Sequence, residues 1–197
     1  LSEEEAERGE VGIPRVLNMY ENYPFWFTLF TSLKFRVVLS PVSSKAIFEK
    51  GMDTISSDTA CYPAKMVHGH IEWLIENGQK FIFYPCLNYE RNEDPTAPNH
   101  YNCPIVASYA EVISNNFADV FRDKLINFSS PFLPYDNDLK LSRRLADEFK
   151  KFHISHAEIM KAVTKAREEQ NRFKDDMKKQ GEYALRYAEN NDKKVIV

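Results

Sequence analysis

Short apolar runs separated by stretches of helical periodicity occur from Val11 onward, and this alternation limits the possible folds more than any other feature. Each run is short and rich in Val, Ile or Phe; the runs are 11–13, 35–39, 81–84 and 125–128. Strands that alternate with helices are typical of an α/β unit with a largely parallel sheet. The pattern therefore predicts a three-layer α/β domain with a mostly parallel sheet.

The segments between these runs have helical spacing and helix-end signals. We expect helices over 18–33, 43–51 and 63–76, with Pro24 kinking or delaying the first of them. Two capping boxes predict further helix starts, at Ser108 with Glu111 and at Ser155 with Glu158.

The last third of the chain predicts a long amphipathic helix. Its apolar residues follow one another at helical steps, with Gln170 and Gln180 interrupting the stripe: Ile159, Val163, Ala166, Phe173, Met177, Ala184 and Tyr187. Two interpretations remain open. The helix either packs on the sheet or on the helix expected around 139–149, or it faces a partner or another domain.

These patterns divide the chain into four parts. We expect an acidic linker at 1–10, a Rossmann-like α/β domain at 11–152, the long helix at 153–192 and the start of a further strand or domain at 193–197. The chain opens with Leu1 rather than Met and closes on an apolar run after Lys194. Both ends are expected to be cut from a longer protein.

Charge and composition exclude several classes of protein. Lys and Arg number 26 against 29 Asp and Glu, a net charge of −3, so nucleic acid and anionic membranes are not expected partners. No apolar run approaches the ~18–20 residues of a membrane span, and the first ten residues do not form a signal peptide. A cytoplasmic location is expected. Three cysteines argue against a disulfide framework and leave buried thiols, a redox site or metal ligation.

The common catalytic and nucleotide-binding motifs are missing from the sequence. The first strand leads into Pro14-Arg15-Val16 with only Gly12 nearby, so neither a dinucleotide fingerprint nor a P-loop forms there. No Gly-x-Ser-x-Gly elbow is present. His68 and His70 are two positions apart on a helix and cannot share a metal; we expect one to be packed and the other solvated.

The three cysteines are expected at one edge of the sheet. Cys61 precedes Pro63 and so lies at a helix N-terminus, Cys86 follows a strand, and Cys103 ends the polar loop 88–102. Ligands of open α/β sheets bind at the carboxyl ends of the strands. Three thiolates with an open fourth position suit a [4Fe–4S] cluster or zinc, although buried free cysteines are also common core residues.

Four segments carry a family resemblance. They are Gly12-Ile13-Pro14-Arg15-Val16-Leu17-Asn18-Met19-Tyr20, Cys61-Tyr62-Pro63-Ala64-Lys65 with Val67-His68-Gly69-His70, Phe81-Ile82-Phe83-Tyr84-Pro85-Cys86, and Asn99-His100-Tyr101-Asn102-Cys103-Pro104-Ile105-Val106. In this order they resemble the uncharacterised domain of large CoA-substrate-specific enzyme activases, the activators of 2-hydroxyacyl-CoA dehydratases. The resemblance runs from about residue 12 to 149 and covers the long helix poorly. Lys34 stands where a Gly is usual in that family.

The resemblance implies a role in ATP-driven electron transfer. Such activators carry an actin-like ATPase with its own iron–sulfur cluster, and the dehydratase subunits hold a [4Fe–4S] cluster on three cysteines in Rossmann-like domains. Carried over to this chain, the ligands are Cys61, Cys86 and Cys103, with Lys65 and Tyr101 beside the cofactor. The implied partners are other domains of the parent activase and a dehydratase-type protein. Loss of such a cluster in air is expected, and ATP hydrolysis is not expected of this chain, which lacks the ATPase segment.

Three functions are therefore compared. The first is an iron–sulfur module in which Lys65 and helix N–H groups offset the cluster's charge. The second is a cofactor-free docking domain that binds the dehydratase or the neighbouring ATPase domain. The third is an enzyme with Cys61 as nucleophile, which lacks a positioned base because His68 lies two turns further along the same helix.

Overall fold

The computed structural model describes residues 1–2 and 4–196, and its centre is a four-stranded parallel sheet. The strands are β1 (Glu10–Ile13), β2 (Arg36–Leu39), β3 (Phe81–Phe83) and β4 (Asn127–Ser129). Their order is β2-β1-β3-β4, and every pair is parallel. The predicted α/β class and parallel sheet are confirmed.

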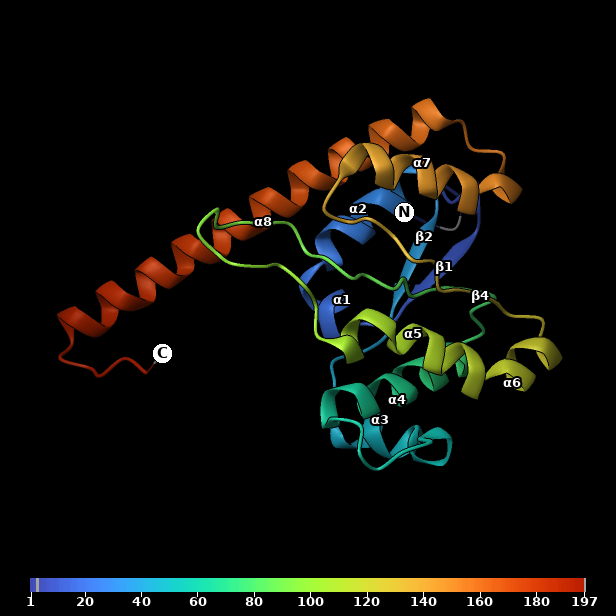
Figure 1. Cartoon of the computed structure of the whole chain (residues 1–197), viewed down its shortest axis with the longest axis horizontal. Coiled ribbons are helices and arrows are strands. Elements are labelled where there is room, and N and C mark those ends of the chain that lie inside the picture. Colours follow the sequence, from blue (N-terminus) through green and yellow to red (C-terminus); the bar gives the residue numbers. More distant parts are fainter. Residues whose placement is uncertain (3, 197) are drawn as a thin grey trace.

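Helices cover both faces of the sheet, as predicted (Figure 1). After the short α1 (Leu17–Glu21), one face carries α2 (Tyr23–Ser32), α7 (Asp138–Glu148) and α8 (His156–Asn190). The opposite face carries α3 (Lys45–Lys50), α4 (Tyr62–Glu76), α5 (Pro104–Asn116) and α6 (Ala118–Asp123). Two short 3-10 turns are Met52–Thr54 and Lys150–Phe152.

Aromatic side chains fill the layer between the sheet and α2. Trp26 and Phe30 lie 5.2 and 5.0 Å from Phe83, measured between ring centroids, and Phe30 lies 5.7 Å from Phe149. All four side chains are buried. Burying one such side chain contributes about 1.5–3 kcal/mol, and each aromatic pair adds about 0.5–1.5 kcal/mol. This cluster therefore holds α2 and α7 on the sheet.

Three helices end in the same turn before a strand. Lys34, Gly78 and Leu125 have φ values of 64°, 78° and 52°. The next residue in each case donates its N–H back into the helix: Phe35 to Phe30, Gln79 to Leu74 and Ile126 to Phe121. This is the Schellman arrangement, which favours Gly at the left-handed position. Lys34 and Leu125 therefore occupy positions that would suit Gly, and the strand predicted at 125–128 begins later, at Asn127, because Leu125 still closes α6.

Two predicted helices differ in their bounds. The segment 18–33 divides at Asn22, two residues before Pro24, which would disrupt a continuous helix; the two parts are α1 and α2. The capping-box start at Ser108 is wrong. The helix begins at Pro104 with Cys103 as its N-cap, and the Ser108 hydroxyl donates to the Pro104 carbonyl at 2.8 Å inside it. Proline favours the first helical position, and this signal outweighed the capping box.

Helix α8 begins as predicted, with the Ser155 hydroxyl accepting the Glu158 N–H at 3.2 Å. Its first half packs on α2 and α7 and buries Ile159, Val163 and Ala166. Its second half leaves the body as an arm (Figure 1). Within residues 1–2 and 4–196, no helix is both long and apolar enough to cross a bilayer.

The last part of the chain follows the arm without regular structure. Residues 193–196 form no helix or strand in the described structure, and Ile196 is 98% exposed. The strand expected over 193–197 ends on Val197, which lies outside the described residues.

Candidate functional site

The carboxyl edge of the sheet carries the residues that sequence reasoning selected. The connection from β1 to β2 passes over one face and the connection from β2 to β3 over the other, so the chain switches sides between β1 and β3. Ligands of open parallel sheets bind outside the carboxyl ends at such a switch. The loops after β1, β2 and β3 are therefore the first place to look for a site.

Cys86 extends β3 at this edge. Its backbone N–H donates to the Pro131 carbonyl at 2.9 Å, its carbonyl accepts the Leu133 N–H at 3.0 Å, and it pairs in parallel with Phe132. The side chain is 1% exposed. Burial first, and then the Glu111 carboxylate, raises the pKa of the Cys86 thiol to about 11. Cys86 is therefore a neutral thiol at neutral pH.

Cys61 and Cys103 occupy equivalent positions on two helices. Cys61 is the N-cap of α4 and Cys103 the N-cap of α5, each followed by a proline in the first turn, and both are exposed. The Cys103 sulfur accepts the Val106 N–H at 3.4 Å. Both sulfurs therefore lie at the positive end of a helix dipole.

The predicted cofactor residues lie near these cysteines in sequence but have other partners. The Lys65 ammonium donates to the Asp58 carbonyl at 3.4 Å, and the Tyr101 ring lies 4.5 Å from that of Tyr89, between centroids. Within residues 1–2 and 4–196, no three His, Cys, Asp or Glu side chains are grouped so that they could hold a metal ion. The donor chemistry suits iron or zinc, whereas the present side-chain arrangement does not form a ligand set.

An amide and carboxylate network lies between the segment after β1 and the loop after β3. Glu90 accepts hydrogen bonds from the side-chain amides of Asn22 at 3.0 and 3.1 Å, Asn102 at 2.9 Å and Asn18 at 3.4 Å. The Asn102 amide also donates to the Leu87 carbonyl at 3.0 Å. Charge-assisted bonds of this kind contribute about 1.5–3 kcal/mol each when protected from water. Sequence reasoning missed this network, which fastens the loop 88–102 to the switch region.

Both histidines of α4 are buried, so the expectation that one is solvated is wrong. His68 bonds Thr54 at 2.9 Å and Tyr109 at 3.0 Å, and His70 bonds Ser40 at 2.7 Å and Ser43 at 3.0 Å. Burial lowers the pKa of each to about 4. Helix α4 is covered by α5 on one side and by the segment after β2 on the other. Both histidines are therefore excluded from water.

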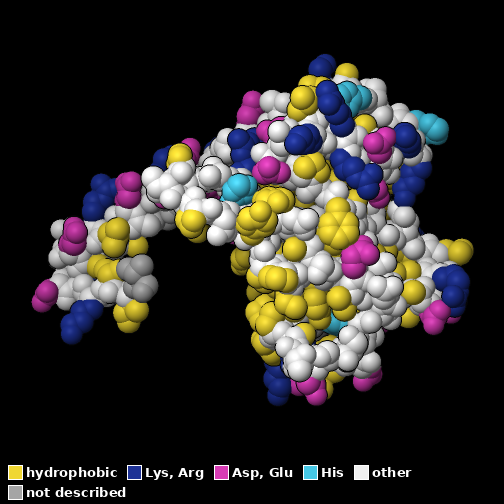
Figure 2. All heavy atoms as spheres, viewed as in Figure 1, with side chains coloured by type: hydrophobic (Ala, Val, Ile, Leu, Met, Phe, Trp, Pro, Cys, Tyr) yellow, Lys and Arg dark blue, Asp and Glu magenta, His cyan; other side chains and the backbone are white. Residues whose placement is uncertain are grey.

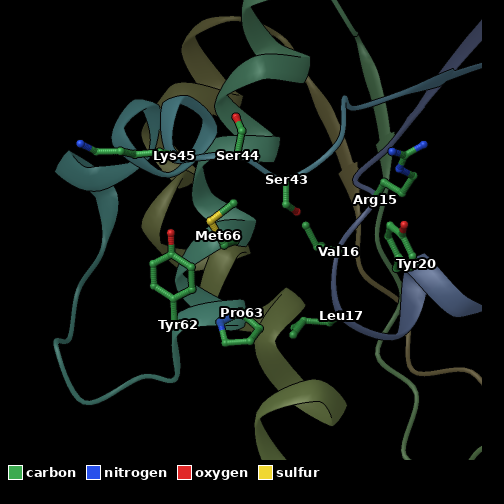
Figure 3. Close-up of a pocket in the computed structure, with 10 residues that line it drawn as sticks. All are labelled: Arg15, Val16, Leu17, Tyr20, Ser43, Ser44, Lys45, Tyr62, Pro63 and Met66. Carbon is green, nitrogen blue, oxygen red and sulfur yellow. The ribbon is translucent and has the colours of Figure 1, made fainter. Parts of the chain in front are cut away.

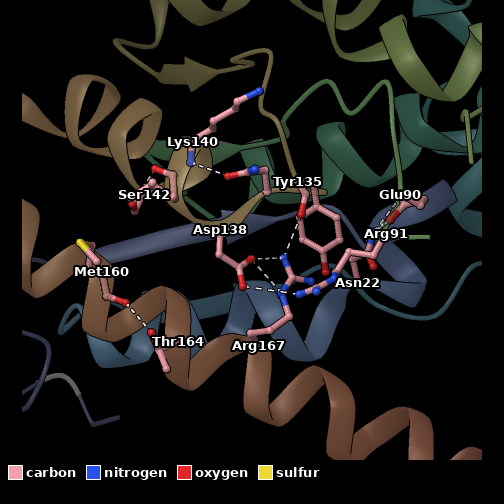
Figure 4. A network of polar contacts seen from close by, with 12 residues as sticks. Asn22, Glu90, Arg91, Tyr135, Asp138, Lys140, Ser142, Met160, Thr164 and Arg167 are labelled. Atoms are coloured by element: carbon pink, nitrogen blue, oxygen red, sulfur yellow. Dashed lines mark hydrogen bonds and ion pairs between the residues drawn. The ribbon is translucent and has the colours of Figure 1, made fainter. Parts of the chain in front are cut away.

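Arg167 anchors α8 to the body (Figure 4). Its guanidinium lies 4.6 and 4.5 Å from the ring centroids of Phe25 and Tyr135, and donates to Asp138 at 2.8 and 3.0 Å. It also donates to the Tyr135 carbonyl at 2.9 Å. A desolvated guanidinium between two rings contributes about 2 kcal/mol per good contact. The sequence did not predict a role for Arg167, because it is one of many charged residues in this helix.

Gln170, which interrupts the apolar stripe of α8, forms hydrogen bonds to both helix ends where α1 and α2 meet. Its carbonyl oxygen accepts the Phe25 N–H at 3.2 Å, and its amide donates to the Glu21 carbonyl at 3.1 Å. The last carbonyls of α1 and the first N–H groups of α2 lack partners within their own helices. The buried Gln170 side chain therefore satisfies both helix ends at once.

Beyond Gln170 the apolar face of α8 continues onto the arm. Phe173, Met177 and Tyr187 lie on the same side of the helix as the buried Ile159 and Ala166, as the period of 3.6 residues requires. Their exposed fractions are 37, 59 and 54%. Figure 2 shows hydrophobic side chains on the arm between charged ones. The apolar side of α8 is thus buried where the helix packs on the body and exposed along the arm.

A comparison with protein-family models decides the classification. The model described as CoA enzyme activase uncharacterised domain matches residues 10–197. The chain belongs to this family. No curated protein and no solved structure matches the chain.

The activase-domain match extends past the four segments that carry the resemblance. It includes α8 and its arm as well as the α/β body. The long helix therefore lies within the region that the family model matches.

Proposed function

We propose that this activase domain is a docking module that binds another domain of its parent activase through the α8 arm. The observation that supports the proposal is the exposed stripe of Phe173, Met177 and Tyr187, which continues the face that α8 buries against α2 and α7. Aromatic residues and Met are enriched in the buried centres of protein interfaces. A dehydratase-type protein is the alternative partner.

The two halves of α8 have different energetics. The first half buries a continuous apolar face and the Arg167 and Gln170 anchors. The arm is held by local ion pairs, Asp176 with Lys179 at 3.3 Å and Glu182 with Arg186 at 3.4 Å, and near its start Lys174 pairs with Glu93 of the loop 88–102. Such exposed pairs contribute about 0.3–0.5 kcal/mol. The arm therefore gains most of its possible stability only when a partner covers its stripe.

Hydrogen exchange in the intact activase tests this docking. We expect the amides of residues 173–187 to exchange rapidly in the isolated domain and to be protected in the full-length activase. Replacing Phe173, Met177 and Tyr187 by Ser in the full-length protein should abolish that protection, while the amides of α4 remain unchanged.

The matched control replaces three residues on the opposite side of the arm, Asp175, Lys178 and Glu189, by Ser. Both triple variants lower helix propensity to a similar extent, so only the loss of apolar contact differs between them. Equal protection of residues 173–187 in the isolated domain and the intact activase would contradict docking through the arm.

A second candidate function is that of an iron–sulfur module supporting ATP-driven electron transfer by the parent activase. Supporting it, Cys86 extends a strand at the carboxyl edge, and Cys61 and Cys103 each begin a helix that follows a strand end. Cys61, Cys86 and Cys103 are the proposed ligands of a [4Fe–4S] cluster, with Lys65 and Tyr101 beside it. A bound cluster would supply one-electron chemistry.

Anaerobic reconstitution with iron and sulfide tests the cluster. We expect a brown protein with about four irons per chain and a reduced iron content after Cys→Ser replacement at any of the three positions. Replacing the buried Ser142 by Ala should leave the iron content unchanged. A colourless protein after reconstitution, or iron that all three Cys→Ser variants retain, would remove this candidate.

A further inference from the structure

A pocket of about 500 Å³ opens between the segment after β1 and the starts of α3 and α4 (Figure 3). Arg15 and Tyr20 lie on one side of it, and Lys45 and Tyr62 lie on the other. Its volume falls within the range of sites for small molecules, and its place at the carboxyl edge of a parallel sheet is where such sites occur. Neither the arm nor any cysteine lines it.

A chain of hydrogen bonds runs from Ser40 through His70 to Ser43, which lines the pocket. The Ser40 hydroxyl, 1% exposed, accepts the Arg15 backbone N–H at 2.7 Å and lies 2.7 Å from His70 Nδ1. We assign the Ser40 proton to Nδ1, because Nδ1 is the acceptor within reach in the described structure. His70 then carries its proton on Nε2 and donates it to Ser43 Oγ at 3.0 Å. The Ser43 hydroxyl proton is left to point at a ligand.

The lining of the pocket carries positive charge. Arg15 and Lys45 are among its ten lining residues, those ten contain no carboxylate, and Lys45 pairs with Glu49 at 3.5 Å, which leaves Arg15 as the lining cation without an ion pair among the described residues. The Arg15 Nε is buried and has no hydrogen-bond partner among the described residues. A buried donor without a partner is unfavourable, and more so on a charged group. An acceptor on a ligand would remove that cost.

The remaining wall is apolar and partly aromatic. Leu17 and Met66 line the pocket together with the rings of Tyr20 and Tyr62, which are 59 and 55% exposed. Tyr62 is held by Phe48, with ring centroids 4.9 Å apart, and the Arg15 guanidinium lies 5.5 Å from the Tyr20 ring centroid. Figure 2 shows hydrophobic side chains gathered over the part of the body where α1 and α4 meet. The wall suits the apolar or aromatic part of a ligand.

We propose that this pocket binds a small organic anion, one that carries a carboxylate or a phosphate on an apolar or aromatic body. The anionic group accepts hydrogen bonds from Ser43 and from the Arg15 guanidinium. The body lies between Tyr20 and Tyr62. This function is separate from docking through the arm and from cluster binding, because the pocket shares no residue with either site.

Calorimetric titration of the purified chain tests the proposal. The probes are phenyl phosphate and benzoate, with benzyl alcohol and inorganic phosphate for comparison, at constant ionic strength in an amine buffer. We expect at least one of the two aromatic anions to bind at least about tenfold more tightly than benzyl alcohol or inorganic phosphate, since hydrogen bonds to charged groups contribute about 1.5–3 kcal/mol. The tighter of the two anions identifies the head group as phosphate or carboxylate.

Two variants place the binding in this pocket. Arg15→Met keeps the aliphatic stem and should weaken binding about tenfold, and Ser43→Ala, at an exposed position, should weaken it several-fold. Lys165→Met removes an exposed cation from α8 and should leave the affinity unchanged. The proposal is overturned if neither aromatic anion binds, if Ser43→Ala binds as tightly as the unchanged chain, or if Lys165→Met weakens binding as much as Arg15→Met.

Discussion

The Gly69→Ala substitution is expected to destabilise the domain by about 3 kcal/mol or more. A Cβ at Gly69 would lie 1.7 Å from the Ile47 carbonyl oxygen, which belongs to the backbone of α3 and cannot swing away. Gly51, at the end of α3, is equally close, because its Cβ would lie 2.2 Å from the Gly69 nitrogen. Helices α3 and α4 therefore touch backbone to backbone, and overpacking of such a contact costs about 1–3 kcal/mol, occasionally more.

Helix propensity alone predicts the opposite sign. Ala is preferred over Gly in a helix interior by about 1 kcal/mol, so Gly69→Ala should stabilise a free helix. Gly181→Ala is the matched control, since Gly181 lies inside α8 and a Cβ there would meet nothing within 4 Å among the described residues. Urea unfolding should show a lower midpoint, or no folded protein, for Gly69→Ala and a slightly higher midpoint for Gly181→Ala. An unchanged or higher midpoint for Gly69→Ala would refute the α3 to α4 contact.

Acidification is the second large effect. We expect the free energy of unfolding to fall as the pH decreases from 6.5 to 4, by up to about 3 kcal/mol for each of His68 and His70. Burial lowers the pKa of both from 6.5 to about 4, with Arg15 acting in the same direction on His70. In this window the unfolded chain binds protons that the folded chain excludes, so linkage makes stability increase with pH. Above pH 6.5 both states are neutral at these positions and the contribution is complete.

The pH dependence of the urea midpoint measures this linkage. Its slope near pH 5 should correspond to about two protons taken up on unfolding, and His68→Gln or His70→Gln should each remove about one of them. His153→Asn, at an exposed position with φ of 53° that Asn tolerates, should leave the slope unchanged. A midpoint that does not change between pH 6.5 and 5 would show that these imidazoles are open to solvent when the chain is folded.

A truncation that tests docking should remove only the second half of α8. Removing everything after Ser155 would expose the sides of α2 and α7 on which the first half of α8 packs, and would leave the ends of α1 and α2 without Gln170. Removing only the arm, from residue 173 onward, preserves those contacts. The packing interpretation therefore describes the first half of α8, and docking is proposed only for the second.

Local signals in the sequence were enough to predict the elements and their class. The runs 11–13, 35–39 and 81–84 are strands because apolar, β-branched and aromatic side chains suit a buried parallel sheet, and Ser155 begins α8 because its hydroxyl caps a neighbouring N–H. Pro63 likewise placed Cys61 at a helix start. Each of these features depends on residues only a few positions apart, so the sequence alone determined them.

The tertiary structure decided the features that join distant segments. Gln170 bonds Phe25 across 145 positions, and Arg167 is buried because Phe25 and Tyr135 flank it. The burial of His68 and His70 depends on which elements cover α4. The hydrogen bond from His70 to Ser43 depends on Ser40, which lies thirty positions before His70 and bonds its other ring nitrogen. Hydrophobic periodicity shows which side of a helix is apolar, but the identity of what packs against it is set by the folded arrangement of the whole chain.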